Sequence, residues 1–163
     1  MKTQSTIRRI VHFTLLMVLG CGLAGHLHAQ AKNLDKTGRA LQGYDPVAFF
    51  TEKKPVKGDP NVSSKVGNAT YYFSNAENKA AFDKEPAKYE PQFGGYCAYG
   101  VSKGDLVKIE VDAFQIVDGR LLLQYNKSIR DKFNKDTAGN LKTADAKWPT
   151  VSKKKPSTGL FGG

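Results

Sequence analysis

The sequence predicts a small α+β domain, in which short helices flank a small antiparallel sheet. Three observations support this fold class. Residues 69–73 are rich in β-branched and aromatic side chains, which is typical of a strand. Residues 114–125 hold two apolar runs on either side of an Asp-Gly turn, the pattern of a β-hairpin. A helix-start signal follows the first strand, and helical patterns return after the hairpin.

In the first half, Asp45 before Pro46 predicts a helix start, because a carboxylate accepts a free backbone N–H and proline fits the first helical position. A short apolar turn follows at residues 47–50. Residues 53–64 are rich in Lys, Pro, Gly and Asp and predict an exposed loop. Residues 67–68, Gly-Asn, predict the turn that leads into the first strand.

Ser74 and Glu77 match a capping box, in which the hydroxyl bonds forward and the carboxylate bonds back. They predict a helix over residues 75–84 that buries Ala76, Ala80 and Phe82. Pro86 predicts the start of a second short helix that ends near Tyr89.

After a glycine pair, residues 96–101 are expected to be extended, and residues 106–111 alternate imperfectly as a strand does. From Ser128 the pattern predicts helix, with a break around Gly139. No internal repeat is evident. The elements therefore describe one domain without a second copy.

The N-terminus has the pattern of an export signal. A positively charged start precedes an apolar run over residues 10–24, shorter than the roughly 20 residues that a membrane span needs. Ala29-Gln30-Ala31 offers the small-x-small site of signal peptidase. We expect cleavage after Ala31, no membrane span after cleavage, and a periplasmic or secreted protein. A lipoprotein with Cys21 as its N-terminus is the alternative.

Cleavage divides the chain into a signal peptide over residues 1–31, a lead-in linker over 32–42, one domain over 43–149 and a flexible basic tail over 150–163. The remaining 132 of the 163 residues are enough to bury a core without disulfides.

The formal net charge is +10, and loss of Lys2, Arg8 and Arg9 with the leader leaves +7. Such a charge favours anionic surfaces in general. Export and the lack of an arginine-rich helix argue against a nucleic-acid partner. Much of the excess lies near the C-terminus, where solvation of the charged side chains is the simpler interpretation.

Cys97 is the only cysteine outside the leader, which also holds all three histidines. A zinc site needs about three or four N or S ligands, so no metal site and no cofactor is predicted for a monomer. Soft copper could be held only by a homodimer that shares Cys97. A hydrolytic nucleophile would lack its usual histidine base.

Thiol redox chemistry needs less, because a thiolate reacts without a base when positive charge or backbone N–H groups lower its pKa. Gly94 and Gly95 expose amides before Cys97, and Tyr96 and Tyr99 flank it as candidate donors. With no resolving cysteine, a sulfenic acid would need an external thiol. The alternative is a buried structural cysteine, the commonest fate of a lone one.

Six segments spread over residues 43–149 form a recognisable set. They are Gly43-Tyr44-Asp45-Pro46-Val47-Ala48, Tyr71-Tyr72-Phe73-Ser74-Asn75-Ala76-Glu77-Asn78, Pro91-Gln92-Phe93-Gly94-Gly95-Tyr96-Cys97-Ala98, Ile116-Val117-Asp118-Gly119, Tyr125-Asn126 and Ala146-Lys147-Trp148-Pro149. Together they resemble the YHS domain family, and within it the exported branch called YHS domain-containing (seleno)protein. The resemblance covers nearly all of the chain that follows the leader.

The resemblance has two implications. Other YHS domains are thought to bind metal through cysteines, but the matching positions here are Ala48, Ser74 and Asn78, so metal binding is not carried over. Some members of the exported branch have selenocysteine at the position of Cys97, which implies a chalcogen nucleophile there.

We therefore expect an exported protein with a single-thiol redox or soft-ligand site at Cys97, shaped by the glycine pair and by Tyr96 and Tyr99. Tyr44 and Asp45 are weaker candidates for the same site. The alternative is a non-enzymatic binding module, for a heavy metal through a Cys97-bridged dimer or for a protein partner, with Cys97 structural. The thiol, small-molecule or protein partner is not identified, and enzyme and binding module both stay open.

Overall fold

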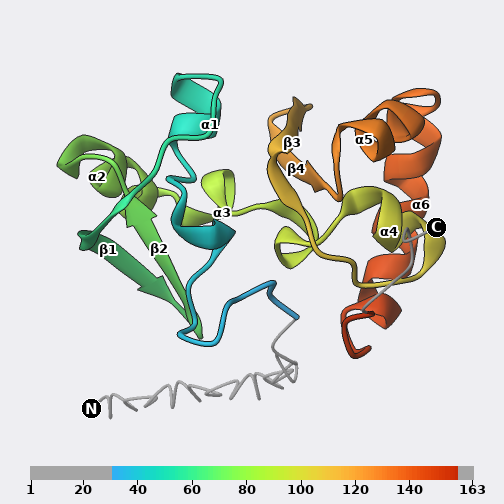
Figure 1. Cartoon of the computed structure of the whole chain (residues 1–163), viewed down its shortest axis with the longest axis horizontal. Helices are drawn as coiled ribbons and strands as arrows, with labels where there is room; N and C mark the ends of the chain where they lie inside the picture. Colours follow the sequence, from blue (N-terminus) through green and yellow to red (C-terminus); the bar gives the residue numbers. More distant parts are fainter. Residues whose placement is uncertain (1–30, 158–163) are drawn as a thin grey trace, which may run out of the picture.

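The computed structural model describes residues 31–157 and confirms the α+β class, with short helices on two small antiparallel sheets. Its elements form two units on opposite sides of the view in Figure 1. The first unit consists of η1 (Leu41–Gly43), α1 (Ala48–Thr51), β1 (Asp59–Val66), β2 (Ala69–Phe73), α2 (Ala76–Lys84) and α3 (Pro86–Tyr89). The second unit consists of η2 (Gln92–Gly95), α4 (Ala98–Lys103), β3 (Glu110–Val117), β4 (Arg120–Gln124), α5 (Lys127–Asn134) and α6 (Thr137–Val151).

The two hairpins have the same register with an offset of 51 residues. Asp59 pairs with Phe73 in the first hairpin, and Glu110 pairs with Gln124 in the second. In each hairpin the register then shifts at a three-residue bulge, and the pairing resumes with four consecutive pairs up to the turn. The second unit therefore repeats the first.

The repeat extends to both sides of the hairpin. Asn75 caps α2 by accepting from the Asn78 N–H, and Asn126 caps α5 by accepting from the Ile129 N–H. Before the hairpins, residues 41–43 and 93–95 both have three consecutive positive φ angles. A three-residue run of this kind is unusual outside glycine, so its occurrence at matching places is a further sign of a repeated backbone.

The prediction of no internal repeat is therefore wrong. Few equivalent positions of the two units hold the same residue type. The main ones are Gly43-Tyr44 with Gly95-Tyr96, Asn75 with Asn126 and Phe82 with Phe133. The repeated property is the backbone hydrogen-bond pattern, which different side chains can satisfy. The sequence signal was too sparse to indicate the duplication without the strand register.

Several predicted elements are confirmed: β2, α2, α3, and the hairpin of β3 and β4. Others differ. Residues 59–64 belong to β1, because their polar side chains suit the solvent face of a two-stranded sheet. The predicted strand over 106–111 begins only at Glu110.

The segment after Tyr96 was predicted to be extended and is instead the start of helix α4, with Cys97 as its N-cap. In α2 only Phe82 is fully buried, while Ala76 and Ala80 are exposed. The predicted break at Gly139 lies earlier, between Asn134 and Thr137.

Two segments are more firmly held than the sequence indicated. Helix α6 continues through Pro149 to Val151, so the tail is shorter than predicted. Residues 32–42, predicted as a lead-in linker, are hydrogen-bonded to both units. The Asn33 N–H donates to the Gly94 carbonyl at 2.8 Å, and the Ala40 N–H donates to the Thr70 carbonyl at 2.9 Å.

Strand β4 connects the two units. Successive side chains of a strand point to opposite faces. Leu121 and Leu123 belong to the larger core, which also contains Phe73 and Phe82 of the first unit. Leu122 belongs to a second core formed with helices of its own unit. Burial on both faces explains why this strand is apolar throughout residues 121–123.

Candidate functional site

Cys97 lies at the junction between the segment after η2 and helix α4. Its side chain is 0 % exposed and is part of the larger hydrophobic core. The backbone is fixed as well, because the Cys97 N–H donates to the Val107 carbonyl at 3.0 Å and the residue forms a bridge with Leu123. In this conformation the sulfur is not in contact with solvent.

The thiol uses its hydrogen-bonding capacity inside the protein. Its Sγ donates to Gln124 Oε1 at 3.2 Å and accepts from the Gly100 N–H at 3.4 Å, which makes it the N-cap of α4. Burial raises the pKa of the Cys97 thiol, and the backbone N–H groups of Gly100, Tyr125 and Tyr99 oppose this rise only in part. The sulfur is therefore held as a neutral thiol at pH 7.

Gln124, the main polar partner of Cys97, was not predicted from the sequence. Its side chain is 0 % exposed, and its Oε1 also accepts from the Tyr99 N–H at 3.0 Å. Its Nε2 has no hydrogen-bond partner among residues 31–157. A glutamine in an otherwise apolar strand, Leu121-Leu122-Leu123-Gln124, was the available signal, since buried polar side chains need partners.

The glycine pair serves a close approach of two backbone segments. Gly94 and Gly95 have φ of 59° and 81°. A Cβ at Gly94 would lie 1.9 Å from the Ala31 carbonyl oxygen. Asn33 donates from its side chain to the Gly95 carbonyl at 3.0 Å. The two glycines thus hold the segment around the predicted cleavage site, with Ala31 before it and Asn33 after it, and they present their amides to no pocket that Cys97 lines.

The predicted tyrosines have different surroundings. Tyr96 is buried in the second core, and burial raises the pKa of its hydroxyl. Tyr99 is half-buried, with Lys103 Nζ 4.6 Å from its ring centroid, and it reaches the Cys97 site through its backbone N–H. Tyr44 belongs to the first unit, where Lys57 Nζ lies 4.0 Å from its ring centroid.

Asp45 is a fully buried carboxylate in the first unit. Its Oδ1 accepts from the N–H groups of Val47 and Ala48 at 2.8 and 3.3 Å. Its Oδ2 accepts from the Ser74 N–H, the Ser74 hydroxyl and the Asn78 amide at 2.8, 2.8 and 2.7 Å. Ser74 and Asn78 thus bind a carboxylate at the positions where the resemblance would place soft metal ligands.

Asp45 and Cys97 occupy equivalent places in the two units. The Asp45 N–H donates to Val56 as the Cys97 N–H donates to Val107. Each side chain accepts a hydrogen bond from a backbone N–H in the first turn of the helix that follows it, Ala48 in α1 or Gly100 in α4. Each also interacts with the backbone N–H of the residue just before the N-cap of the helix after the hairpin, Ser74 before α2 or Tyr125 before α5. The structure therefore places the two predicted site residues in two copies of one backbone pocket.

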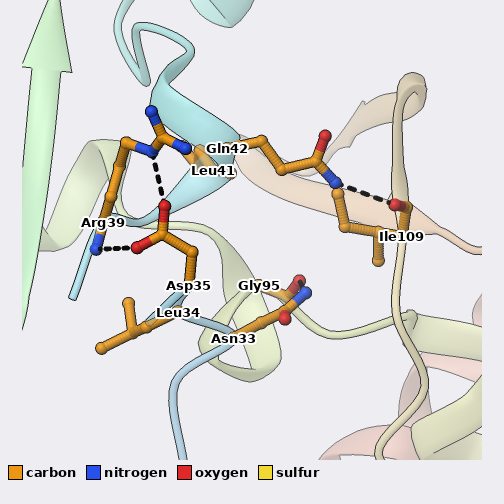
Figure 2. A pocket seen from close by; sticks show the side chains of 8 residues that line it. All are labelled: Asn33, Leu34, Asp35, Arg39, Leu41, Gln42, Gly95 and Ile109. Atoms are coloured by element: carbon orange, nitrogen blue, oxygen red, sulfur yellow. Dashed lines mark hydrogen bonds and ion pairs between the residues drawn. The ribbon is translucent and has the colours of Figure 1, made fainter. Parts of the chain in front are cut away.

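A pocket of about 160 Å³ lies between the units (Figure 2). Gln42 reaches across to donate to the Ile109 carbonyl at 3.1 Å, and Arg39 pairs with Asp35 at 2.7 Å. The pKa of Asp35 is lowered to about 2, chiefly by its hydrogen bond from Thr37. Leu41 and Gln42, in its wall, have φ of 51° and 55°, a strained conformation of the kind often found at binding sites.

A more open groove of about 520 Å³ also has Gln42 and Ile109 in its wall. A third pocket of about 300 Å³ contains Trp148 and two ion pairs, Lys32–Glu90 at 2.6 Å and Arg120–Asp145 at 2.6 Å. The three pockets combine polar and charged side chains of both signs. Cys97 lines none of them.

The positive charge is concentrated on the last two helices. Residues 127–155 contain nine lysines and arginines against three aspartates, whereas residues 32–126 contain thirteen against twelve acids. Most of these basic side chains are exposed, including Lys132, Lys135 and Lys142. We call the basic side chains of residues 127–155 the basic face.

Residues 31–157 contain no group of three or more His, Cys, Asp or Glu side chains placed to hold a metal ion. Within the same residues, no helix is long and apolar enough to cross a membrane. The predicted signal peptide and the alternative lipid site at Cys21 lie outside the described residues. Comparison with protein-family models, with curated proteins and with solved structures gives no match.

Replacement of Asp45 by Asn tests the buried carboxylate. The change keeps the shape but replaces one acceptor oxygen with an NH2 donor that faces other donors, so we expect the free energy of unfolding to fall by about 2–4 kcal/mol in urea denaturation. Asp112→Asn is the matched control, because Asp112 is exposed in β3, and it should stay within about 0.5 kcal/mol. Equal effects of the two changes would contradict the network described for Asp45.

Replacement of Gly94 by Ala, in a chain that retains Ala31, tests the contact between these two residues. Gly67→Ala is the control, because Gly67 has a φ of 63° and nothing within 4 Å of an added Cβ. In the control, the free energy of unfolding should fall by about 1 kcal/mol from backbone strain alone. In Gly94→Ala, the free energy of unfolding should fall by at least about twice as much in the same urea denaturation. Similar losses would mean that the Ala31 segment does not pack on Gly94.

Proposed function

We propose that this chain is an exported member of the YHS domain family that acts as a non-enzymatic binding module. The family assignment is supported by the segments over residues 43–149 and by their α+β arrangement. Export is supported by the charged start, the apolar run and the Ala-x-Ala site of the leader. Of the two functions expected from the sequence, the binding module agrees better with the geometry around Cys97.

The observation that carries the proposal is the state of the Cys97 sulfur. It is fully buried, its pKa is raised by burial, and it caps α4 in the place where Asp45 caps the first unit. A nucleophilic thiol needs to be ionised and accessible. A structural cap needs neither, so in the closed native state Cys97 is assigned to stability. A metal-bridged dimer through this sulfur would require its exposure and is not favoured.

The basic face supports a protein partner with an acidic surface. Lysines on a surface of mixed charge usually contact only solvent. Residues 32–126 have such a surface, because their positive and negative charges nearly balance. The excess in residues 127–155 is local, and it lies on helices whose opposite sides bury Ile129, Phe133 and Leu141. A rigid surface with a net positive charge attracts and orients a partner of opposite sign.

Thiol chemistry at Cys97 is the second candidate, and one observation favours it. Backbone N–H groups of Tyr99, Gly100 and Tyr125 surround the sulfur and act to lower its pKa. If local opening exposed the thiol, these groups would stabilise a thiolate. The two candidates differ in a measurable property, the reactivity of the thiol in the folded protein.

Thiol accessibility separates the candidates. In a Cys21→Ser background Cys97 is the only cysteine, so a colorimetric disulfide reagent such as DTNB reports on it alone. We expect its reaction in the folded protein to be at least about 100-fold slower than in denaturant, because the sulfur reacts only through opening. Rapid reaction at pH 7 under native conditions would instead support the thiol-centred function.

Charge reversal tests the basic face, with poly-L-glutamate as the probe. The triple change Lys132→Glu, Lys135→Glu and Lys142→Glu should weaken binding about tenfold at low salt. The control Lys36→Glu, Lys65→Glu and Lys84→Glu alters net charge equally on exposed sites outside the basic face, and it should have a clearly smaller effect. Equal weakening would show that only net charge matters.

A vesicle of anionic lipid serves as the second probe of the basic face. Binding to such vesicles with no binding to poly-L-glutamate would contradict a protein partner.

A further inference from the structure

The repeat shows what the backbone pocket around Cys97 is built to hold. In the first unit the same pocket contains a carboxylate, Asp45, that accepts five hydrogen bonds while fully buried. Three of the five donors are backbone N–H groups, of Val47, Ala48 and Ser74. Such convergent N–H groups stabilise an anion.

The second unit keeps the backbone part of this pocket. By the repeat, the N–H groups of Val47, Ala48 and Ser74 correspond to those of Tyr99, Gly100 and Tyr125, and all three of the latter act on Cys97. A neutral thiol uses these donors poorly, since sulfur is a weak acceptor. The Gly100 N–H lies 3.4 Å from Sγ, and the Tyr99 N–H is shared, because it also donates to Gln124 Oε1 at 3.0 Å.

Gln124 provides an independent observation that the site is incomplete. Its amide group touches Cys97 through Oε1, at 3.2 Å from Sγ, while the Nε2 of the same amide is buried without a hydrogen-bond partner among residues 31–157. An unpaired buried N–H₂ group costs free energy. An acceptor oxygen on the sulfur of Cys97 would provide the missing partner. Gln124 thus corresponds in role to the Asn78 amide that binds Asp45.

We propose that Cys97 is an oxidation site whose stable product is the sulfinate, which takes the place that the Asp45 carboxylate has in the first unit. A sulfinate and a carboxylate share a single negative charge spread over two oxygens on one central atom. Its oxygens would accept from the N–H groups of Tyr99, Gly100 and Tyr125 and from Gln124 Nε2. Gln124 is a positioning residue in this assignment.

The oxidant is a hydroperoxide, of which two equivalents are consumed. The sulfur attacks one peroxide oxygen, the O–O bond breaks, and an alcohol or water leaves while Cys97 becomes a sulfenic acid. The sulfenic sulfur attacks a second peroxide in the same way and becomes a sulfinic acid, whose proton passes to solvent. The sulfur loses four electrons in total, and two O–O bonds are reduced. No resolving thiol takes part.

Burial sets the rate of this modification and protects its product. The sulfur becomes reachable when the α4 N-terminus opens locally, and a peroxide is smaller than an alkylating or disulfide reagent. After closure the N–H groups bind the sulfinate, and further oxidation is blocked by burial. Cys97 would therefore be oxidised slowly, and the oxidised form would persist after the peroxide is gone. This modification is independent of the binding function proposed for the basic face.

The first test exposes the folded full-length protein to hydrogen peroxide and maps the tryptic peptide of residues 89–103 by mass spectrometry. We expect a mass gain of two oxygens that accumulates without a third, while the protein remains folded by circular dichroism. Cys97→Ser should show no gain on this peptide. In Gln124→Met, which removes the amide at similar volume, the two-oxygen product should fall at least about fivefold. No two-oxygen product in the folded wild type, or progression to three oxygens, would overturn the proposal.

The second test asks whether the pocket prefers an anion, by comparing Cys97→Asp with Cys97→Asn in thermal unfolding. If the N–H groups stabilise an anion, the native pKa of the new Asp is depressed. The Asp variant should then unfold at least about 3 °C higher than the Asn variant at pH 7, and the gap should close as pH falls below about 4. An Asn variant as stable as the Asp variant at pH 7 would overturn the proposal. If both variants fail to fold, the mass measurement decides.

Discussion

The fold depends on one repeated interaction, a buried acceptor that collects backbone N–H groups from two separate segments. In the first unit Asp45 joins the start of α1 to the junction of β2 and α2. In the second unit Cys97 joins the start of α4 to the end of β4. These connections fix each hairpin relative to the helix before it. Since the orphan N–H groups of a helix start need partners, each unit depends on the side chain that provides them.

The same constraint explains why the two acceptors differ in surroundings. Asp45 carries a full charge and is surrounded by side-chain donors from Ser74 and Asn78 in addition to backbone N–H groups. Cys97 lies in the larger hydrophobic core with a single polar side chain, Gln124, in contact with its sulfur. A charge buried with few donors is costly, whereas a thiol is not. The donors that contact the reduced Cys97 therefore suit a neutral thiol, and Gln124 Nε2, unpaired among the described residues, is the additional donor that an anion at this site would use.

Local patterns in the sequence predicted local structure well. The Asp-Gly turn, the apolar alternation and Pro86 led to the second hairpin and to α3. The capping box predicted at Ser74 and Glu77 gave the place of α2 but the wrong cap, because Asn75 caps the helix and the Ser74 hydroxyl donates to Asp45. The sequence did not predict what depends on contacts between distant segments: the strand β1, the helical start at Cys97, and the burial of its sulfur against Gln124. The role of Cys97 as a cap was missed because cysteine is not a usual N-cap residue. Asp45 was recognised as a cap, and only the register of the hairpins relates the two.

The close packing of Ala31 on Gly94 has a consequence for the order of events in biogenesis. The peptide bond after Ala31 is followed by Lys32 and then by Asn33, whose N–H donates to the Gly94 carbonyl at 2.8 Å. A peptidase binds its substrate as an extended chain, and a chain docked on the domain cannot adopt that state. If a leader is removed after Ala31, as the sequence predicts, its removal would have to precede the docking of residues 31–33, and a molecule that docked them first would keep its leader.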